Sequence, residues 1–78
     1  MVTPEHVQSL IAQGIACDHL EVSGDGAHFE ALIVSEAFAG KSRVARHQLV
    51  NRALGTQMGN EIHALSMKTL TPEEWRAT

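Results

Sequence analysis

Apolar residues recur at helical spacing near the start of the chain: Val7, Leu10, Ile11 and Ile15. This spacing is typical of a helix with one apolar face. Thr3 is a suitable N-cap, Pro4 suits the first helical position, and Gly14 is a suitable residue for the end of the helix. The pattern therefore predicts a helix that starts after Thr3 and ends at Gly14.

From residue 18 onward apolar and polar residues alternate, as they do in a strand with one buried face. A first strand is expected over 18–23, with Leu20 and Val22 facing inward. A second strand is expected over 28–36. It carries apolar residues on both faces, so it belongs at the centre of the sheet. The turn-forming residues Ser23-Gly24-Asp25-Gly26 join the two strands into a hairpin.

A second helix is predicted over 43–54, with Ser42 as its cap. Its apolar positions are Val44, Ala45, Leu49, Val50, Ala53 and Leu54. A short helical turn between Gly55 and Gly59 leads to a third strand over 61–69. The sequence Thr71-Pro72-Glu73-Glu74 is typical of a capping box, which predicts a final helical turn that Trp75 packs back on the domain.

The elements follow the order α-β-β-α-β-α over a single domain, residues 1–78. A hairpin followed by a crossover helix and a further strand predicts a three-stranded mixed sheet. The crossover is expected to be right-handed, with the helices covering one face of the sheet. The fold class is therefore α+β.

Composition narrows the function classes. The chain has 78 residues and a formal net charge of −3, whereas a protein that binds phosphates usually carries a basic excess. Its one cysteine, Cys17, permits no internal disulfide, which fits a cytoplasmic protein, and a buried inert thiol is expected. No apolar run is long enough to span a membrane, and the start of the chain shows no secretion signal. No serine has a nucleophile-elbow context, so nothing in the sequence points to an enzyme.

Four of the six basic residues lie within twelve positions: Lys41, Arg43, Arg46 and Arg52. Arg43 and Arg46 are three residues apart, so they share a helix face. Positive charge at the start of a helix opposes the helix dipole, so it does not stabilise the helix. These residues and His47 form either a solvated face or a contact for an anionic partner protein or nucleic acid. His47 borders the apolar stripe, where a packed, hydrogen-bonded ring is expected.

The five histidines are the unusual feature of the composition. His6 and His19 fall on polar positions and are expected at the surface. His63 lies on the apolar side of the third strand, where spacing alone favours a structural role. His28 flanks the glycine turn, which is either a plain hairpin turn or a loop that presents Asp25 and His28 as ligands. No two histidines have the short spacing of a zinc site.

Two long motifs resemble the BolA family. Residues 34–51 read VSEAFAGKSRVARHQLVN, which is similar to the signature of that family, and residues 62–75 read IHALSMKTLTPEEW, which is similar to its carboxyl-terminal motif. The resemblance extends from about Thr3 to Trp75. The turn segment VSGDGAHF, residues 22–29, is most similar to the bacterial acid-stress branch, the IbaG or YrbA type.

The resemblance implies a class II KH-like fold, which agrees with the predicted order of elements. It also implies a partner, a monothiol glutaredoxin of the CGFS type, and a [2Fe–2S] cluster that the pair holds together with glutathione. The family histidine of the Ile-His-Ala motif, a cluster ligand, corresponds to His63. The second ligand usually comes from the turn between the first two strands. The position of its cysteine is occupied here by Asp25, so His28 is the stronger candidate and Asp25 the weaker one.

The favoured interpretation is a non-enzymatic adaptor that shares a [2Fe–2S] cluster with a glutaredoxin, in cluster trafficking or in iron, redox or acid-stress regulation. The basic face of the second helix would then dock an acidic partner surface. The alternative is a DNA-binding transcriptional regulator that uses the same face, against which the net charge and the single loop glycine, Gly40, both argue. A weak homodimer without a metal role is a third interpretation. No cluster is expected in the isolated chain, because half of the ligands belong to the partner.

Overall fold

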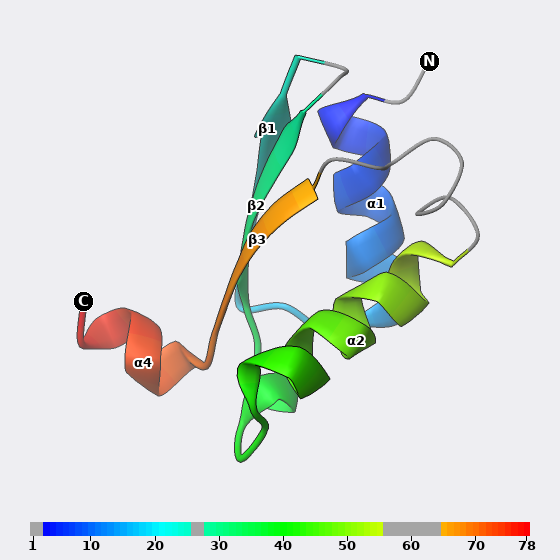
Figure 1. The fold of residues 1–78 in the computed structure, drawn as a ribbon. Helices are drawn as coiled ribbons and strands as arrows, with labels where there is room; N and C mark the ends of the chain where they lie inside the picture. Colours follow the sequence, from blue (N-terminus) through cyan, green and yellow to red (C-terminus); the bar gives the residue numbers. More distant parts are fainter. Residues whose placement is uncertain (1–2, 26–27, 56–64) are drawn as a thin grey trace.

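The computed structural model describes residues 3–25, 28–55 and 65–78. Their elements are α1 (Pro4–Gly14), β1 (His19–Gly24), β2 (Phe29–Val34), the 3-10 turn η1 (Glu36–Phe38), α2 (Arg43–Leu54), β3 (Leu65–Leu70) and α4 (Pro72–Arg76). Figure 1 shows α1 and α2 on one side of the sheet and α4 beyond the end of β3 on the other side. The predicted α+β class is confirmed. The expectation that helices cover one face holds for α1 and α2, whereas α4 departs from it.

The first helix has the predicted bounds. The Thr3 side chain accepts a hydrogen bond from the backbone N–H of His6, and Pro4 is the first helical residue. Gly14 is the last helical residue, as predicted, but it does not have the left-handed backbone angle of a capping glycine. A Cβ atom on Gly14 would lie 2.6 Å from the Cβ of Ala53, so glycine is required for the close approach of α1 to α2.

The sheet has the order β1-β2-β3, with β2 at the centre as predicted. β1 and β2 pair antiparallel, and β2 and β3 pair parallel. The prediction extended β2 too far at its end, because Ser35 leaves the strand. Its buried hydroxyl donates to the carbonyl oxygen of Ala16 at 2.7 Å and accepts from the N–H of Ala37 at 3.1 Å, so the serine caps η1.

The second helix begins after Ser42, whose hydroxyl accepts from the N–H of Ala45, and ends at Leu54, as predicted. One of its predicted apolar positions is wrong: Val44 is 66% exposed. Val44 precedes the buried Val50 by six residues, a rotation of about 240° around the helix, so it faces solvent. The predicted turn between Gly55 and Gly59 and the first part of the predicted third strand lie outside the described residues.

The last helix begins with the predicted capping box, in which Thr71 and Glu74 bond reciprocally through their side chains and backbone N–H groups. Trp75 packs back on the domain, though it remains 37% exposed. Its ring stacks on His19 with 4.4 Å between centroids, and the His19 ring also contacts the carboxylate of Glu21. His19 is therefore half-buried rather than a free surface residue.

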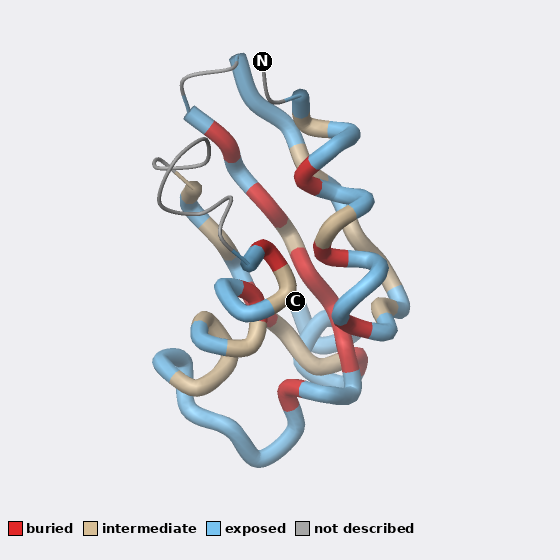
Figure 2. Tube along the Cα trace, turned by 90° about the vertical axis from the view of Figure 1, so that its right-hand side faces the viewer, coloured by how far each residue is buried: buried red, intermediate tan, exposed pale blue. Residues whose placement is uncertain are grey.

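The core lies between the two long helices and the inner face of the sheet. Figure 2 shows buried positions repeating along β2 and on the facing turns of the helices. The buried cluster comprises Val7, Ile11, Ile15, Phe29, Ala31, Ile33, Phe38, Val50 and Leu54. Leu20 and Val22 pack against this cluster, as the alternation in β1 predicts.

Candidate functional site

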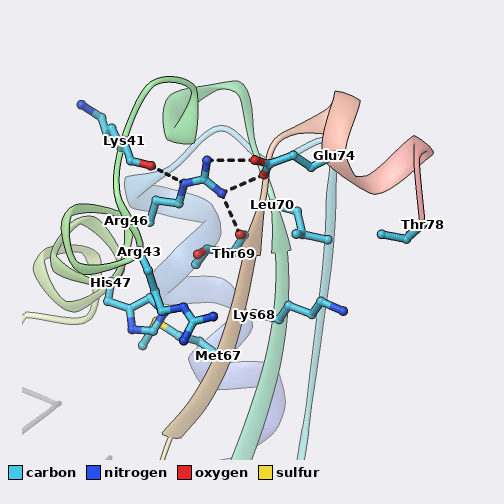
Figure 3. A pocket seen from close by; sticks show the side chains of 10 residues that line it. All are labelled: Lys41, Arg43, Arg46, His47, Met67, Lys68, Thr69, Leu70, Glu74 and Thr78. Carbon is cyan, nitrogen blue, oxygen red and sulfur yellow. Dashed lines mark hydrogen bonds and ion pairs between the residues drawn. The ribbon is translucent and has the colours of Figure 1, made fainter.

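A basic groove lies between the amino-terminal half of α2 and β3 (Figure 3). Its volume is about 590 Å³, and it is lined by Lys41, Arg43, Arg46, His47, Met67, Lys68, Thr69, Leu70, Glu74 and Thr78. Four consecutive residues of β3 line the groove. Because neighbouring residues of a strand point to opposite faces, the groove must run along the edge of β3. We call this feature the α2–β3 groove.

Arg46 closes one end of the α2–β3 groove. Its Nε donates to the carbonyl oxygen of Lys41, and its Nη1 donates to that of Thr69, both at 3.0 Å. Nη1 and Nη2 also donate to the two carboxylate oxygens of Glu74, at 2.8 and 3.2 Å. The guanidinium lies 6.0 Å from the centre of the Phe38 ring. The Arg46 side chain is only 13% exposed, and through these contacts it joins α2, β3 and α4.

The ion pair changes the acidity of both partners. The hydrogen bonds from Arg46, and next the backbone N–H of Thr71, lower the pKa of Glu74 from 4.5 to about 2. The hydrogen bond to Glu74 raises the pKa of Arg46. Glu74 is thus ionised over the physiological range, and its charge is matched by that of Arg46.

The structure brings together most of the basic residues that the sequence singled out. Lys41, Arg43 and Arg46 line the α2–β3 groove, whereas Arg52 is exposed on α2 and does not line it. Because Arg46 is engaged internally, the case for a partner contact in the groove depends on the other cations. Sequence reasoning missed Lys68, which lines the groove from β3. Its position on the polar side of that strand was visible, but its distance from α2 was not.

His47 also lines the groove and is half-buried, as its position beside the apolar stripe predicts. Figure 3 shows its ring beside Arg43 and Met67. The expected hydrogen bond of this ring is not among those formed by the described part of the chain. His47 is therefore packed but retains its polar atoms for a ligand or for water.

The turn between β1 and β2 holds the second set of candidates. The N–H of His28 donates to a carboxylate oxygen of Asp25 at 2.9 Å, and the N–H of Asp25 donates to the carbonyl oxygen of His28 at 3.2 Å. These two bonds close the turn and leave His28 exposed. The carboxylate of Asp25 thus has a structural task, while the His28 ring extends from a fixed backbone. His63 lies outside the described residues.

The register connects this turn with the start of β3. Phe29, which follows His28, is paired with Leu65, and His63 precedes Leu65 by two residues in the sequence. Within residues 3–25, 28–55 and 65–78, no three histidine, cysteine or carboxylate side chains are gathered as a metal site requires. A metal bound at this end of the sheet would therefore need further ligands.

Cys17 is set apart from both places. It is half-buried, and its Sγ donates to the carbonyl oxygen of Ile15 at 3.4 Å. Burial, and next the negative charge of Asp18, raise the pKa of the thiol. A raised pKa disfavours the reactive thiolate, in line with the packed thiol that the sequence predicts. No helix among the described residues is long and apolar enough to cross a membrane.

The order α-β-β-α-β-α, the central β2 and the α2–β3 groove define a small α+β domain with surfaces suited to binding. The family model described as BolA-like protein matches residues 6–74. The chain therefore belongs to the BolA-like protein family, as its two motifs predict.

Relatives and solved structures agree with this assignment. The chain is 44% identical to "Protein BOLA2" of Arabidopsis thaliana, over 97% of this chain and 86% of that protein. It is 41% identical to "Acid stress protein IbaG" of Escherichia coli K12, over 88% and 83%. The "DNA-binding transcriptional regulator BolA" of Vibrio cholerae is 49% identical, over 68% and 50%. A crystal structure of a bol-like protein from Babesia bovis has a TM-score of 0.87 and 41% identity, over 99% and 93%.

Proposed function

We propose that this chain is an adaptor that binds a monothiol glutaredoxin of the CGFS type and shares a [2Fe–2S] cluster with it. His63 and His28 would be the ligands from this chain, and the glutaredoxin cysteine and glutathione would supply the others. Asp25 is the weaker candidate, because its carboxylate already accepts the His28 N–H. The role would be cluster trafficking or regulation by iron, redox state or acid stress.

The observation that carries this proposal is the pairing of Phe29 with Leu65. It sets the exposed His28 beside the strand end that His63 precedes by two residues in the sequence. The two histidines are 35 positions apart in the chain, so no short sequence spacing relates them. An exposed ring at a strand end suits a ligand that must reach a group shared with another protein.

The donor set fits an iron–sulfur cluster. Imidazole is an established ligand in place of a thiolate, and it carries no negative charge when neutral. A shared cluster with histidine on one side has a higher reduction potential than one held by four thiolates. Asp25 bonds to both the N–H and the carbonyl oxygen of His28, and these two bonds limit the positions that the His28 ring samples.

Co-expression with a CGFS glutaredoxin and anaerobic co-purification would test the proposal. Absorption and circular dichroism spectra are compared for wild type, His63→Ala and His28→Ala. His6→Ala is the matched control, because His6 is an exposed histidine of α1. We expect a coloured mixed complex whose spectrum changes in the first two variants and not in the control. A complex whose spectrum ignores both histidines, or failure of any mixed complex to form, would overturn the proposal.

A second candidate, DNA binding, is favoured by the cations Lys41, Arg43 and Lys68 of the α2–β3 groove. Relatives from Vibrio cholerae and Haemophilus influenzae bear the name "DNA-binding transcriptional regulator BolA". If these three cations each neutralise one phosphate, the logarithm of the affinity should fall with the logarithm of salt concentration with a slope of about −3. Arg43→Glu should abolish binding to duplex DNA, whereas Arg52→Glu, outside the groove, should change it little. Equal effects of the two variants would reject the groove as a DNA site.

A further inference from the structure

β3 has an outer edge that no other strand covers within the described residues. The strand order ends at β3, which pairs with β2 alone. The carbonyl of Leu70 points toward β2, because it accepts the N–H of Ser35 that follows that strand. The carbonyl of Thr69 points the other way and accepts from Arg46. Backbone groups alternate along a strand, so Leu65 and Met67 direct their N–H and C=O groups outward, as Thr69 does.

The outward groups of β3 differ in what they bind. Arg46 satisfies the carbonyl of Thr69 and so ends the open edge there. The outward N–H and C=O groups of Met67 take part in none of the hydrogen bonds among the described residues. The α2–β3 groove, about 590 Å³ in volume, runs along this edge and includes Met67 in its lining. An unpaired edge beside an open groove offers a template for one further strand.

The groove carries positive charge on both sides of the edge. Lys41 lines it from the loop before α2, Arg43 from the first residue of α2, and Lys68 from β3. The carboxylate of Glu74, also in the lining, is already matched by Arg46. Figure 3 shows the Arg43 side chain reaching toward β3, while the Lys68 side chain extends from β3 in the direction away from Arg43. The charges thus lie on the two sides where the side chains of an added strand would alternate.

We propose that the α2–β3 groove binds an extended acidic polypeptide segment of a partner protein, which pairs with the outer edge of β3. The backbone of the segment bonds with Met67 and Leu65. Its carboxylates on one side meet Arg43 and Lys41, and those on the other side meet Lys68. Strand addition of this kind takes its affinity from backbone bonds and its specificity from the side-chain positions. This proposal does not depend on cluster sharing.

A polypeptide fits the edge better than a nucleic acid does. The outward N–H and C=O groups of a strand alternate as donor and acceptor, which another peptide backbone matches, whereas a phosphate backbone offers acceptors alone. The net charge of −3 repels a long polyanion, while a short acidic segment meets mainly the local cations. Nucleic acid is therefore the competing outcome of the test.

The probe is a fluorescein-labelled seven-residue peptide in which pairs of glutamates alternate with single valines, so that its carboxylates lie on both faces when it is extended. Its binding is titrated by fluorescence anisotropy. Control peptides carry lysine in place of glutamate, or proline in place of the valines, which keeps the charge and removes backbone donors. Bound and free protein are compared by amide hydrogen exchange. We expect binding of the acidic peptide alone, with slower exchange of the Met67 and Leu65 amides. Unchanged exchange at both amides, or equal binding of the proline peptide, would overturn the proposal.

Variants separate the edge from general electrostatics. Arg43→Glu and Lys68→Glu should each weaken binding about tenfold, whereas Arg52→Glu, with the same change in charge, should weaken it less than twofold. Met67→Pro removes an outward N–H and leaves the ladder to β2, so it should abolish binding while the protein stays folded. If Arg52→Glu matches Arg43→Glu, or if a single-stranded oligonucleotide of equal charge binds more tightly than the peptide and protects neither amide, the groove is not a peptide site.

Discussion

Replacing Arg46 by alanine should destabilise the fold far more than an ordinary surface change on α2. The side chain is 13% exposed and bonds to two backbone carbonyls, those of Lys41 and Thr69. A net contribution of about 1 kcal/mol for each such bond gives a loss of about 2 kcal/mol in the free energy of unfolding. The pair with Glu74 is screened by solvent, because that carboxylate is 45% exposed, so it adds less than the carbonyl bonds.

Thermal unfolding followed by circular dichroism would measure the effect. A loss of about 2 kcal/mol in a domain of this size lowers Tm by about 8 to 16 °C. Arg52→Ala is the control, because Arg52 is an exposed residue of the same helix, and its effect should stay within about 0.5 kcal/mol. Glu74→Gln separates the two kinds of bond. If it lowers Tm as much as Arg46→Ala does, the ion pair and not the carbonyl bonds holds the three elements together, and the reasoning fails.

Three further predictions concern the ionisation of Glu74 and two other contacts. The pKa of Glu74 is lowered from 4.5 to about 2, so its ionised form stabilises the fold fully above pH 4.5, and this contribution is lost as the pH falls toward 2. The Tm values of wild type and of Glu74→Gln should therefore converge between pH 4.5 and pH 2. A constant difference in Tm from pH 7 to pH 2 would contradict this. Gly14→Ala should lower the free energy of unfolding by about 1–3 kcal/mol despite the better helix propensity of alanine, and adding Ala53→Gly should recover part of the loss in chemical denaturation. His19→Ala should shift the emission maximum of Trp75 to longer wavelength, because the stacked ring no longer shields the indole, and an unchanged spectrum would mean that the stack does not persist in solution.

The helix starts were predictable because their signals are local. Thr3, Ser42 and Thr71 each bond to an N–H three residues ahead, so the residue types and their spacing contain the whole interaction. The central position of β2 was also predictable, because apolar residues on both faces are typical of a strand inside a sheet rather than at its edge. The prediction of Val44 as part of the apolar face was wrong, because its apolar character alone does not determine which side of the helix it lies on.

The groove could not be predicted, because it depends on contacts between distant parts of the chain. Arg46 and Glu74 are 28 positions apart, and nothing in the spacing of either indicates the other. The sequence therefore placed Arg46 with the free cations, although the fold uses it internally. Lys68 is the opposite case. The sequence shows only that it lies on the polar side of a strand, and it becomes part of the groove because α2 packs beside that strand.

β3 separates the two places where this chain can meet partners. Its amino-terminal end lies beside the start of β2 and His28, whereas Thr69 lies beside α2 and Arg46. At about 3.3 Å per residue, four steps from Leu65 to Thr69 place these ends about 13 Å apart. Sites so far apart act independently unless one ligand covers both. If the two sites bind separate ligands, Arg43→Glu should leave the formation and spectrum of the mixed cluster complex unchanged, and His28→Ala should leave the affinity for the acidic peptide unchanged. If Arg43→Glu also weakens formation of the mixed complex, one partner reaches the cluster end while its acidic segment lies along β3.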